Sequence, residues 1–455
     1  MPGLARHRRR KPDRARRLAF DVLRAVSAES AYANLALSAL LAERDLDGRD
    51  AAFATELLAG TCRWQGTYDT IIAAAAGREL GSLQPAVLDL LRLGAHQILA
   101  MRVPAHAAVS ATVDLATATV GGRVAGLVNA VLRGVAADRL DGWLDRLSEG
   151  LDPFDRLALC TAHPRWIVET YAELLPADEL EVALATDNVS PQVSLAVRPG
   201  LASVTELLAA GASPGRHSPF AARISGNPAQ LAAVRDGRAG VQDEGSQLVA
   251  WALARAAAPE GAWLDLCAGP GGKTALLTGL AAAEGSRVVA ADVVPHRARL
   301  VAAASRGYAV GGSEPLVVVA DGTQPAWRRG CFSRVLADVP CSGLGALRRR
   351  PEARWRRGPD VVERLHPLQR ALLTSAIEAA APGGVACYAT CSPHPRETVA
   401  VVTETLAERD DVEVIEAQPL LPELSDATVG PYLQLWPHRQ GTDAMFAAFL
   451  SKSDR

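Results

Sequence analysis

The 455-residue sequence has only three lysines among its 48 basic residues, so arginine is its usual cation. Its seven cysteines form no Cys-x-x-Cys pair, which argues against a zinc ribbon. Their odd number and irregular spacing also fit poorly with a disulfide framework, so reduced thiols in a cytosolic protein are expected. No apolar run reaches the 18 residues of a membrane span, and the Arg-rich N-terminus lacks the apolar region of a secretory signal. With a net charge of −2 and 49% hydrophobic residues, the composition predicts an ordinary soluble globular protein.

A chain of this length is too long for one hydrophobic core and should form two or three domains. Apolar residues recur with helical spacing and without strand signals in the N-terminal part, which predicts an all-helical domain over residues 1–140. Residues 141–240 mix helical stretches with short strand-like runs such as 193–197, and we expect a connector and a small α+β module there. Residues 241–455 should form the catalytic domain.

This last region alternates strands with helices, which predicts a mostly parallel, doubly wound, Rossmann-like α/β sheet. The predicted strands are 262–266, 287–291, 316–320, 334–338 and 384–390. In such sheets, ligands bind in the crevice outside the carboxyl ends of the strands.

A glycine-rich loop follows the first of these strands and opens a helix. A phosphate-binding P-loop would need glycine where Cys267 stands, and a dinucleotide fingerprint would need its third glycine at Thr274. Both patterns fail, and the remaining interpretation is a loop along which S-adenosylmethionine lies. The residues expected to bind this cofactor are Cys267, Ala268, Gly269, Pro270, Gly271, Gly272 and Lys273.

Carboxylates at the ends of the following strands support a nucleotide-like ligand. Asp292 ends the second predicted strand, where a carboxylate can bind ribose hydroxyls. Asp321 follows the third strand and could contact the adenine, and Asp338 ends the fourth. A single aspartate after a strand is more often a helix cap, but three at successive strand ends are harder to explain that way.

Two cysteines stand at the same predicted edge. Cys341 lies in a tight Pro-Cys-Ser-Gly turn, and Cys391 directly follows the last predicted strand. Four others are expected to be small core residues: Cys62, Cys160, Cys331 and Cys387. Carbon 5 of cytosine is a poor nucleophile until a thiolate adds to carbon 6, and the ring then needs an acid or hydrogen-bond partner at N3, which suits Asp338. A free thiol has a pKa of about 8.5 and needs local activation, to which Lys273 could contribute, although its more direct role is contact with the base.

These segments together resemble the RNA cytosine-5 methyltransferases, in particular the bacterial 16S ribosomal RNA branch of RsmB or Sun type. The helical N-terminal region resembles the NusB-like domain of the same branch. The segments that carry the resemblance are Asp338–Gly343, Thr390–Pro393, Gly269–Lys273, Arg348–Trp355, Gly441–Phe446 and, in the helical region, Leu127–Arg133. Residues 194–199 depart from the family pattern, which has an Arg before the Val and an Asn after it.

The resemblance implies that Cys391 is the nucleophile and that Cys341 assists release of the methylated base. It also implies that residues 267–273, with Asp292, Asp321 and Asp338, bind S-adenosylmethionine, and that Asp338 touches the cytosine as well. We therefore expect a cytoplasmic, monomeric methyltransferase without a metal, acting on small-subunit ribosomal RNA.

Other functions stay open at this stage. Transfer RNA is the alternative substrate, and a DNA cytosine-5 methyltransferase would instead use the Pro-Cys thiol as its nucleophile. A non-catalytic RNA-binding assembly factor is the alternative from another class, against which the two thiols and the complete cofactor loop count. Arginine runs at residues 6–17 and 348–357 are candidate phosphate contacts or, alternatively, solvated surface.

Overall fold

The computed structural model describes residues 12–29 and 32–453, so residues 6–11 of the first arginine run lie outside the described residues. The chain forms two compact units. One, the helical unit, comprises the chain up to Val189 together with Leu347–Arg356. The other, the catalytic unit, comprises Ser190–Ala346 and Arg357–Arg455. These limits differ from the predicted boundaries at 140 and 240.

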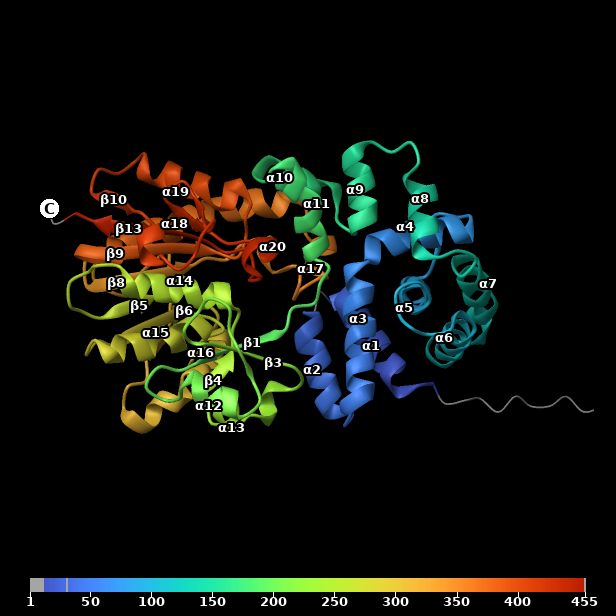
Figure 1. The fold of residues 1–455 in the computed structure, drawn as a ribbon, viewed down its shortest axis with the longest axis horizontal. Helices are drawn as coiled ribbons and strands as arrows, with labels where there is room; N and C mark the ends of the chain where they lie inside the picture. The colour runs from blue at the N-terminus through green and yellow to red at the C-terminus, as the bar shows by residue number, and fades with distance from the viewer. Residues whose placement is uncertain (1–11, 30–31, 454–455) are drawn as a thin grey trace, which may run out of the picture. The chain divides into compact units, whose positions relative to one another are not determined.

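The helical unit contains the predicted N-terminal helices, whose apolar stripes form one core with Leu18, Leu57, Leu90 and Leu132 fully buried (Figure 1). Pro85 stands at the first position of the helix that runs to Leu99, where its missing N–H costs no helical hydrogen bond. Four more helices follow within the predicted connector and belong to this unit, because each buries an apolar face, as α10 does with Ile167, Val168 and Tyr171. The helices are α1 (Arg14–Glu29), α2 (Ala33–Glu43), α3 (Gly48–Arg63), α4 (Gln65–Ala76), α5 (Pro85–Leu99), α6 (Ala105–Thr119), α7 (Ala125–Val135), α8 (Leu140–Ser148), α9 (Pro153–Thr161), α10 (Arg165–Leu174) and α11 (Ala177–Thr186).

The second arginine run is only partly a solvated surface, because Arg354 and Arg348 are buried in the helical unit whereas Arg349 and Arg356 are exposed. Arg354, in the short helix α17 (Ala353–Arg356), is fully buried and donates to the carbonyl oxygens of Ala162 and Asp187 at 2.8 and 3.2 Å. Trp355 donates to the carbonyl of Cys62 at 2.8 Å. Arg354 and Trp355 therefore anchor this segment within the helical unit, and phosphate contact by the exposed arginines of the run stays a prediction.

The catalytic unit begins with a small antiparallel sheet of strand order β2-β3-β1-β4, which is the expected small α+β module. Alternate residues of its central strand, Leu195 and Val197, point into a separate small core. The elements are β1 (Val193–Val197), α12 (Val204–Ala209), β2 (Ser213–Pro214), β3 (Ala221–Ile224), α13 (Ala232–Arg235) and β4 (Ala239–Val241).

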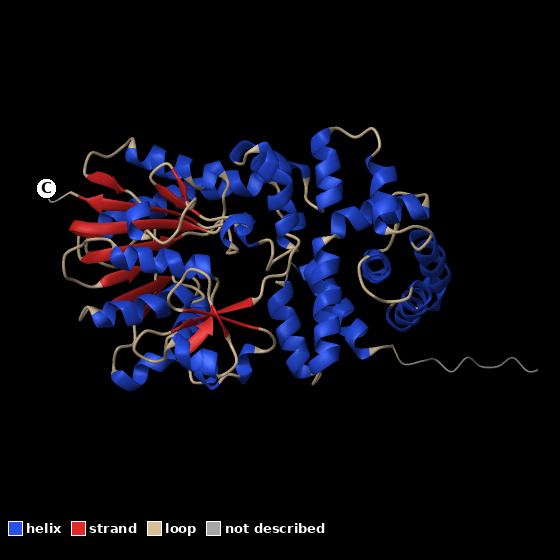
Figure 2. Ribbon diagram, in the orientation of Figure 1, coloured by secondary structure: helices blue, strands red, loops and turns tan. Residues whose placement is uncertain are grey.

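A nine-stranded sheet of order β11-β12-β13-β9-β8-β5-β6-β7, with β10 paired to β13, forms the centre of this unit (Figure 2). The five predicted strands are confirmed as its parallel part, and four antiparallel strands extend it. The strands are β5 (Trp263–Asp265), β6 (Val288–Asp292), β7 (Leu316–Val319), β8 (Phe332–Asp338), β9 (Ala380–Thr390), β10 (Val412–Ile415), β11 (Thr428–Val429), β12 (Tyr432–Gln434) and β13 (Phe446–Lys452).

Helices cover both faces of this sheet, as the continuous apolar runs of β8 and β9 require. Leu336 and Cys387 share a core with the helices of one face, whereas their neighbours Val335 and Ala386 share a core with those of the other. The first face carries α14 (Glu244–Arg255), α15 (Gly272–Ala283) and α16 (Pro295–Ala304), and the second carries α18 (Pro359–Ala379) and α19 (Val399–Leu406). The short helix α20 (Pro437–Gln440) precedes β13. This arrangement confirms the doubly wound architecture and aligns the carboxyl ends of β5, β6, β7, β8 and β9 at one edge.

Among the residues that the structure describes, no helix has the length and apolar character needed to cross a membrane.

Candidate active site

The glycine loop joins the end of β5 to the start of α15, and two of its glycines leave no room for a side chain. Gly271 has φ +104°, and a Cβ there would lie 2.7 Å from the Cα of Val301. A Cβ on Gly269 would lie 2.5 Å from Oδ2 of Asp292. The absence of side chains at these two positions therefore lets the loop backbone pack closely against α16 and the end of β6.

Asp292 shapes this loop from the end of β6. Its buried carboxylate accepts the N–H groups of Gly269 and Val294, each at 2.9 Å. Arg297 lies 3.4 Å from the same carboxylate and donates to the carbonyl oxygen of Gly269 at 2.6 Å. Asp292 thus lies beside the predicted cofactor residues, and sequence reasoning did not identify the contribution of Arg297.

The other two strand-end carboxylates have different surroundings. Asp321 is exposed beyond β7, where it accepts hydrogen bonds from the N–H and hydroxyl of Thr323 at 2.9 and 2.8 Å, and these bonds lower its pKa. Asp338 ends β8 and forms an ion pair of 2.7 Å with Nζ of Lys273. Burial alone would lower the pKa of Lys273, but the charge of Asp338 and its hydrogen bond outweigh burial and raise that pKa. Lys273 is therefore a charged ammonium.

The two predicted thiols meet. Although fifty residues separate them in the sequence, Sγ of Cys341 lies 3.4 Å from Sγ of Cys391. A hydrogen bond from Cys341 lowers the pKa of Cys391, and the charge of Lys273 lowers it further by a smaller amount. Burial and the charges of Asp338 and Asp443 oppose this shift. The same contact, burial and the charges of Cys391 and Glu397 raise the pKa of Cys341. Cys391 is therefore the more readily ionised thiol of the pair, and the strongest effect that lowers its pKa is the hydrogen bond from Cys341, ahead of the charge of the predicted Lys273.

A backbone bond joins the two cysteine loops directly, and Ala444 adds a second backbone bond to the loop that carries Cys341. Gly345 donates its N–H to the carbonyl oxygen of Cys391 at 2.9 Å, and Ala444 donates to the carbonyl oxygen of Gly345 at 2.9 Å. A Cβ on Gly345 would lie 2.0 Å from the carbonyl oxygen of Ala444, so only glycine fits there. The loop that carries Cys341 is thus fixed directly against Cys391.

Sequence reasoning missed Asp265, which ends β5 beneath the glycine loop. Its side chain is fully buried, Thr274 donates to its Oδ2 at 2.6 Å, and its Oδ1 has no hydrogen-bond partner among the described residues. Burial raises the pKa of Asp265 to about 7. Its position at a strand end was the available signal, the same one that identified Asp292 and Asp338.

These features fit S-adenosylmethionine. Its amino group is cationic and can use an acceptor such as the unpaired oxygen of Asp265, and its carboxylate suits the N-terminus of α15. In the described part of the chain, no group of three or more His, Cys, Asp or Glu side chains could hold a metal ion.

Comparison with known families agrees with this geometry. The family model described as 16S rRNA methyltransferase RsmB/F matches residues 252–451, and the NusB family model matches residues 13–137. The chain is 53% identical to a putative methyltransferase of Mycobacterium tuberculosis, over 98% of each protein. It is 31% identical to a probable ribosomal RNA small subunit methyltransferase B of Synechocystis, over 96% of this chain and 99% of that protein.

Solved structures show the same fold. The crystal structure of PH0851 superposes with a TM-score of 0.80 at 22% identity, covering 97% of this chain and 99% of its own. The structure of NSun6 from Pyrococcus horikoshii with SFG superposes with a TM-score of 0.54 at 16% identity, covering 64% of this chain and 98% of its own.

Proposed function

Because the chain belongs to the RsmB/F family of 16S rRNA methyltransferases, we propose that it methylates carbon 5 of a cytosine in 16S ribosomal RNA through a covalent bond to Cys391. At the coarser level it is an S-adenosylmethionine-dependent RNA methyltransferase with a NusB domain. A substrate of this kind implies action in the cytoplasm.

The proposed reaction starts with the target base out of its stack, at the sheet edge. The thiolate of Cys391 adds to carbon 6, which makes carbon 5 an enamine carbon and therefore a nucleophile. When bound, S-adenosylmethionine supplies the methyl group as an electrophilic carbon on sulfur. After carbon 5 has taken the methyl group, a base takes the proton from carbon 5. The electron pair of that C–H bond re-forms the ring double bond, and the bond between carbon 6 and Sγ of Cys391 breaks, with its electron pair staying on the sulfur.

The pair of Lys273 and Asp338 gives the base both a donor and an acceptor. The ammonium of Lys273 can donate to the ring side that gains negative charge, and the carboxylate of Asp338 can accept from the exocyclic amino group. Cys341, the pKa of which is raised while that of Cys391 is lowered, is placed to return a proton to the departing sulfur. This supports the assignment of Cys341 to product release.

The single observation that carries the proposal is the 3.4 Å contact between the two thiols, beside the Lys273–Asp338 pair. The test is methyl transfer by the purified full-length protein to three substrates that lack 5-methylcytosine: 16S rRNA, small ribosomal subunits and transfer RNA. Digested nucleosides are then analysed by mass spectrometry. We expect 5-methylcytosine at one position of 16S rRNA and none with Cys391→Ser. Label only in transfer RNA would change the substrate, and label on another base or atom would overturn the proposal.

A further inference from the structure

Each of the two active-site cysteines is followed by a serine, and the two serines contact one another as the thiols do. Oγ of Ser342 lies 3.1 Å from Oγ of Ser392, and both side chains are fully buried. This contact is a further connection between the loop after β8 and the loop after β9, beside the thiol contact and the backbone bond from Gly345 to Cys391. The relative position of the thiols therefore depends on a buried polar pair one residue further along each loop.

A buried carboxylate, Glu397, organises this pair. Its side chain is fully buried, and its Oε1 accepts the N–H of Ser342 at 2.7 Å. Its Oε2 accepts a hydrogen bond from the hydroxyl of the same serine. Because Ser342 gives its hydroxyl proton to Glu397, Ser392 must be the donor in the contact between the serines. The carboxylate thus sets the direction of the whole chain of hydroxyl groups.

Glu397 is also connected to the other side of Cys341. Nε2 of Gln369 donates to Oε1 of Glu397 at 3.1 Å and to the carbonyl oxygen of Pro340 at 2.9 Å. The residues before and after Cys341 are therefore both held by groups that converge on one carboxylate. Tyr388 donates to the backbone carbonyl of Glu397 at 2.7 Å, which fixes Glu397 against β9.

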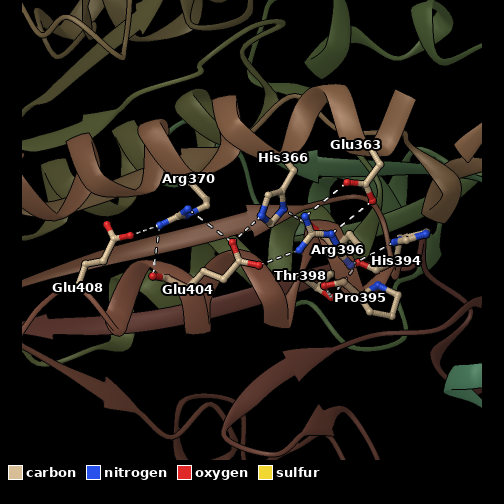
Figure 3. A network of polar contacts seen from close by, with 9 residues as sticks. All are labelled: Glu363, His366, Arg370, His394, Pro395, Arg396, Thr398, Glu404 and Glu408. Atoms are coloured by element: carbon tan, nitrogen blue, oxygen red, sulfur yellow. Dashed lines mark hydrogen bonds and ion pairs between the residues drawn. The ribbon is translucent and has the colours of Figure 1, made fainter. Parts of the chain in front are cut away.

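A polar network supports the segment that carries Glu397. This segment, η6 (Pro395–Glu397), lies between α18 and α19, and Figure 3 shows His366 between the backbone of Arg396 and the carboxylate of Glu404. The ring nitrogens of His366 lie 2.6 Å from the carbonyl oxygen of Arg396 and 2.8 Å from Oε2 of Glu404. Arg396 itself donates to Glu404 at 2.7 Å. The residue immediately before Glu397 is therefore held at its backbone and its side chain.

From this arrangement, and on the basis of the function proposed above, we propose that Glu397 is a positioning residue that holds Cys341 against Cys391 and keeps Cys341 the proton-bearing partner. The geometric part rests on the bonds to Ser342 and, through Gln369, to Pro340. The electrostatic part rests on the charge of Glu397, because a carboxylate near Cys341 disfavours ionisation of that thiol. The contact with Cys391, burial, and the charges of Cys391 and Glu397 raise the pKa of Cys341.

Glu397→Gln separates the two contributions. The amide oxygen can still accept from Ser342 and Gln369, and the amide nitrogen can donate to the Ser342 hydroxyl, which then donates to Ser392. The substitution therefore removes the charge while leaving the bonds possible, whereas Glu397→Ala removes both. Glu408→Gln is the matched control, because Glu408 lies at the far exposed end of the same network and pairs with Arg370.

The first measurement is the rate of alkylation of each thiol by iodoacetamide as a function of pH, read by peptide mass spectrometry on the full-length protein without RNA. In Glu397→Gln we expect Cys341 to react at lower pH, with its rate at a fixed pH below the midpoint rising roughly tenfold for each unit by which its pKa falls. Glu408→Gln should match the unsubstituted protein. Coincident Cys341 profiles for Glu397→Gln and the unsubstituted protein would overturn the proposal.

The second measurement is methyl transfer. Glu397→Ala should lower kcat with little change in KM for RNA, and Glu397→Gln should recover part of kcat because the bonds are restored. A loss confined to KM, or equal losses in both variants and in Glu408→Gln, would contradict a positioning role. Because alkylation needs no RNA, it tests the role of Glu397 independently of the proposed function. Failure of the unsubstituted protein to methylate any cytosine would refute the proposed function. Active protein whose Cys341 alkylation is unchanged by Glu397→Gln would refute only this inference.

Discussion

Oγ1 of Thr274 donates a hydrogen bond of 2.6 Å to Oδ2 of Asp265, and this bond joins the first turn of α15 to a fully buried carboxyl group at the end of β5. Oδ1 of Asp265 has no hydrogen-bond partner among the described residues. Burial raises the pKa of this group to about 7, although the bond from Thr274 opposes the shift. A carboxyl group that titrates near neutral pH therefore lies directly beneath the cofactor loop.

The pH dependence of stability should reveal this group. Because its folded-state pKa of about 7 lies above the unfolded value of 3.8, the group reduces stability progressively as pH rises from about 4 to about 7. The full effect is about 4 kcal/mol, from roughly three pKa units at 1.36 kcal/mol each. Asp265→Asn removes it, so the stability difference between variant and unsubstituted protein should grow over this range and level off above it. Denaturant unfolding at several pH values measures this difference. Parallel curves of unfolding free energy against pH for the two proteins would contradict the raised pKa of Asp265.

The parallel strands and the thiols could be predicted from the sequence because their signals are local. Each parallel strand is a short apolar run that ends at a polar turn, and Cys341 and Cys391 stand just beyond two such runs. The antiparallel strand β13 was not predicted as a strand, since a short, continuous apolar run does not distinguish a strand from a buried helix.

Long-range burial could not be predicted. Arg354 lies in a charge run that has the composition of solvated surface, yet its acceptors at Ala162 and Asp187 are more than 160 residues away in the sequence. Glu397 stands in a polar stretch with no periodicity, and only the packing of η6 against the loop after β8 makes it a buried carboxylate. No local sequence pattern identifies the hydrogen-bond partners of Arg354 or of Glu397.

Asp292 should contribute strongly to cofactor affinity. Asp292→Ala removes the acceptor for the N–H of Gly269 and the partner of Arg297, together with any bond to the ribose. We expect binding of S-adenosylmethionine to weaken by roughly 1.5–3 kcal/mol, the cost of losing charged hydrogen bonds. Titration calorimetry measures the affinity, and Asp410→Ala, which removes an exposed carboxylate of the same unit, is the control. Unchanged affinity in folded Asp292→Ala would remove Asp292 from the site.

Arg354 should stabilise the helical unit rather than bind RNA. Arg354→Met leaves the acceptors at Ala162, Asp187 and Asn188 without their donor, at a cost of about 2–4 kcal/mol. Hydrogen exchange in peptides covering α9 and α11 should therefore become faster. Arg349→Met, which changes an exposed residue of the same run, should alter stability by only about 0.5 kcal/mol. Equal exchange in the two variants would contradict the anchoring role.

The two cysteines should separate by their kinetics. Cys391→Ser should form no adduct and give no turnover, because a hydroxyl is far less ionised than a thiol. Cys341→Ser should still form the adduct, because the serine hydroxyl can donate a hydrogen bond to Cys391. It should fail to resolve the adduct, because a hydroxyl is a far weaker acid than a thiol and does not give up its proton to the departing sulfur. A protein–RNA species should therefore survive denaturing electrophoresis. Cys341→Ala has no group that can donate to Cys391. Because that hydrogen bond lowers the pKa of Cys391, its loss should make the adduct form more slowly. A covalent protein–RNA adduct that accumulates with Cys391→Ser and not with Cys341→Ser would exchange the two roles. Normal turnover in every variant, with no adduct trapped, would exclude the covalent mechanism.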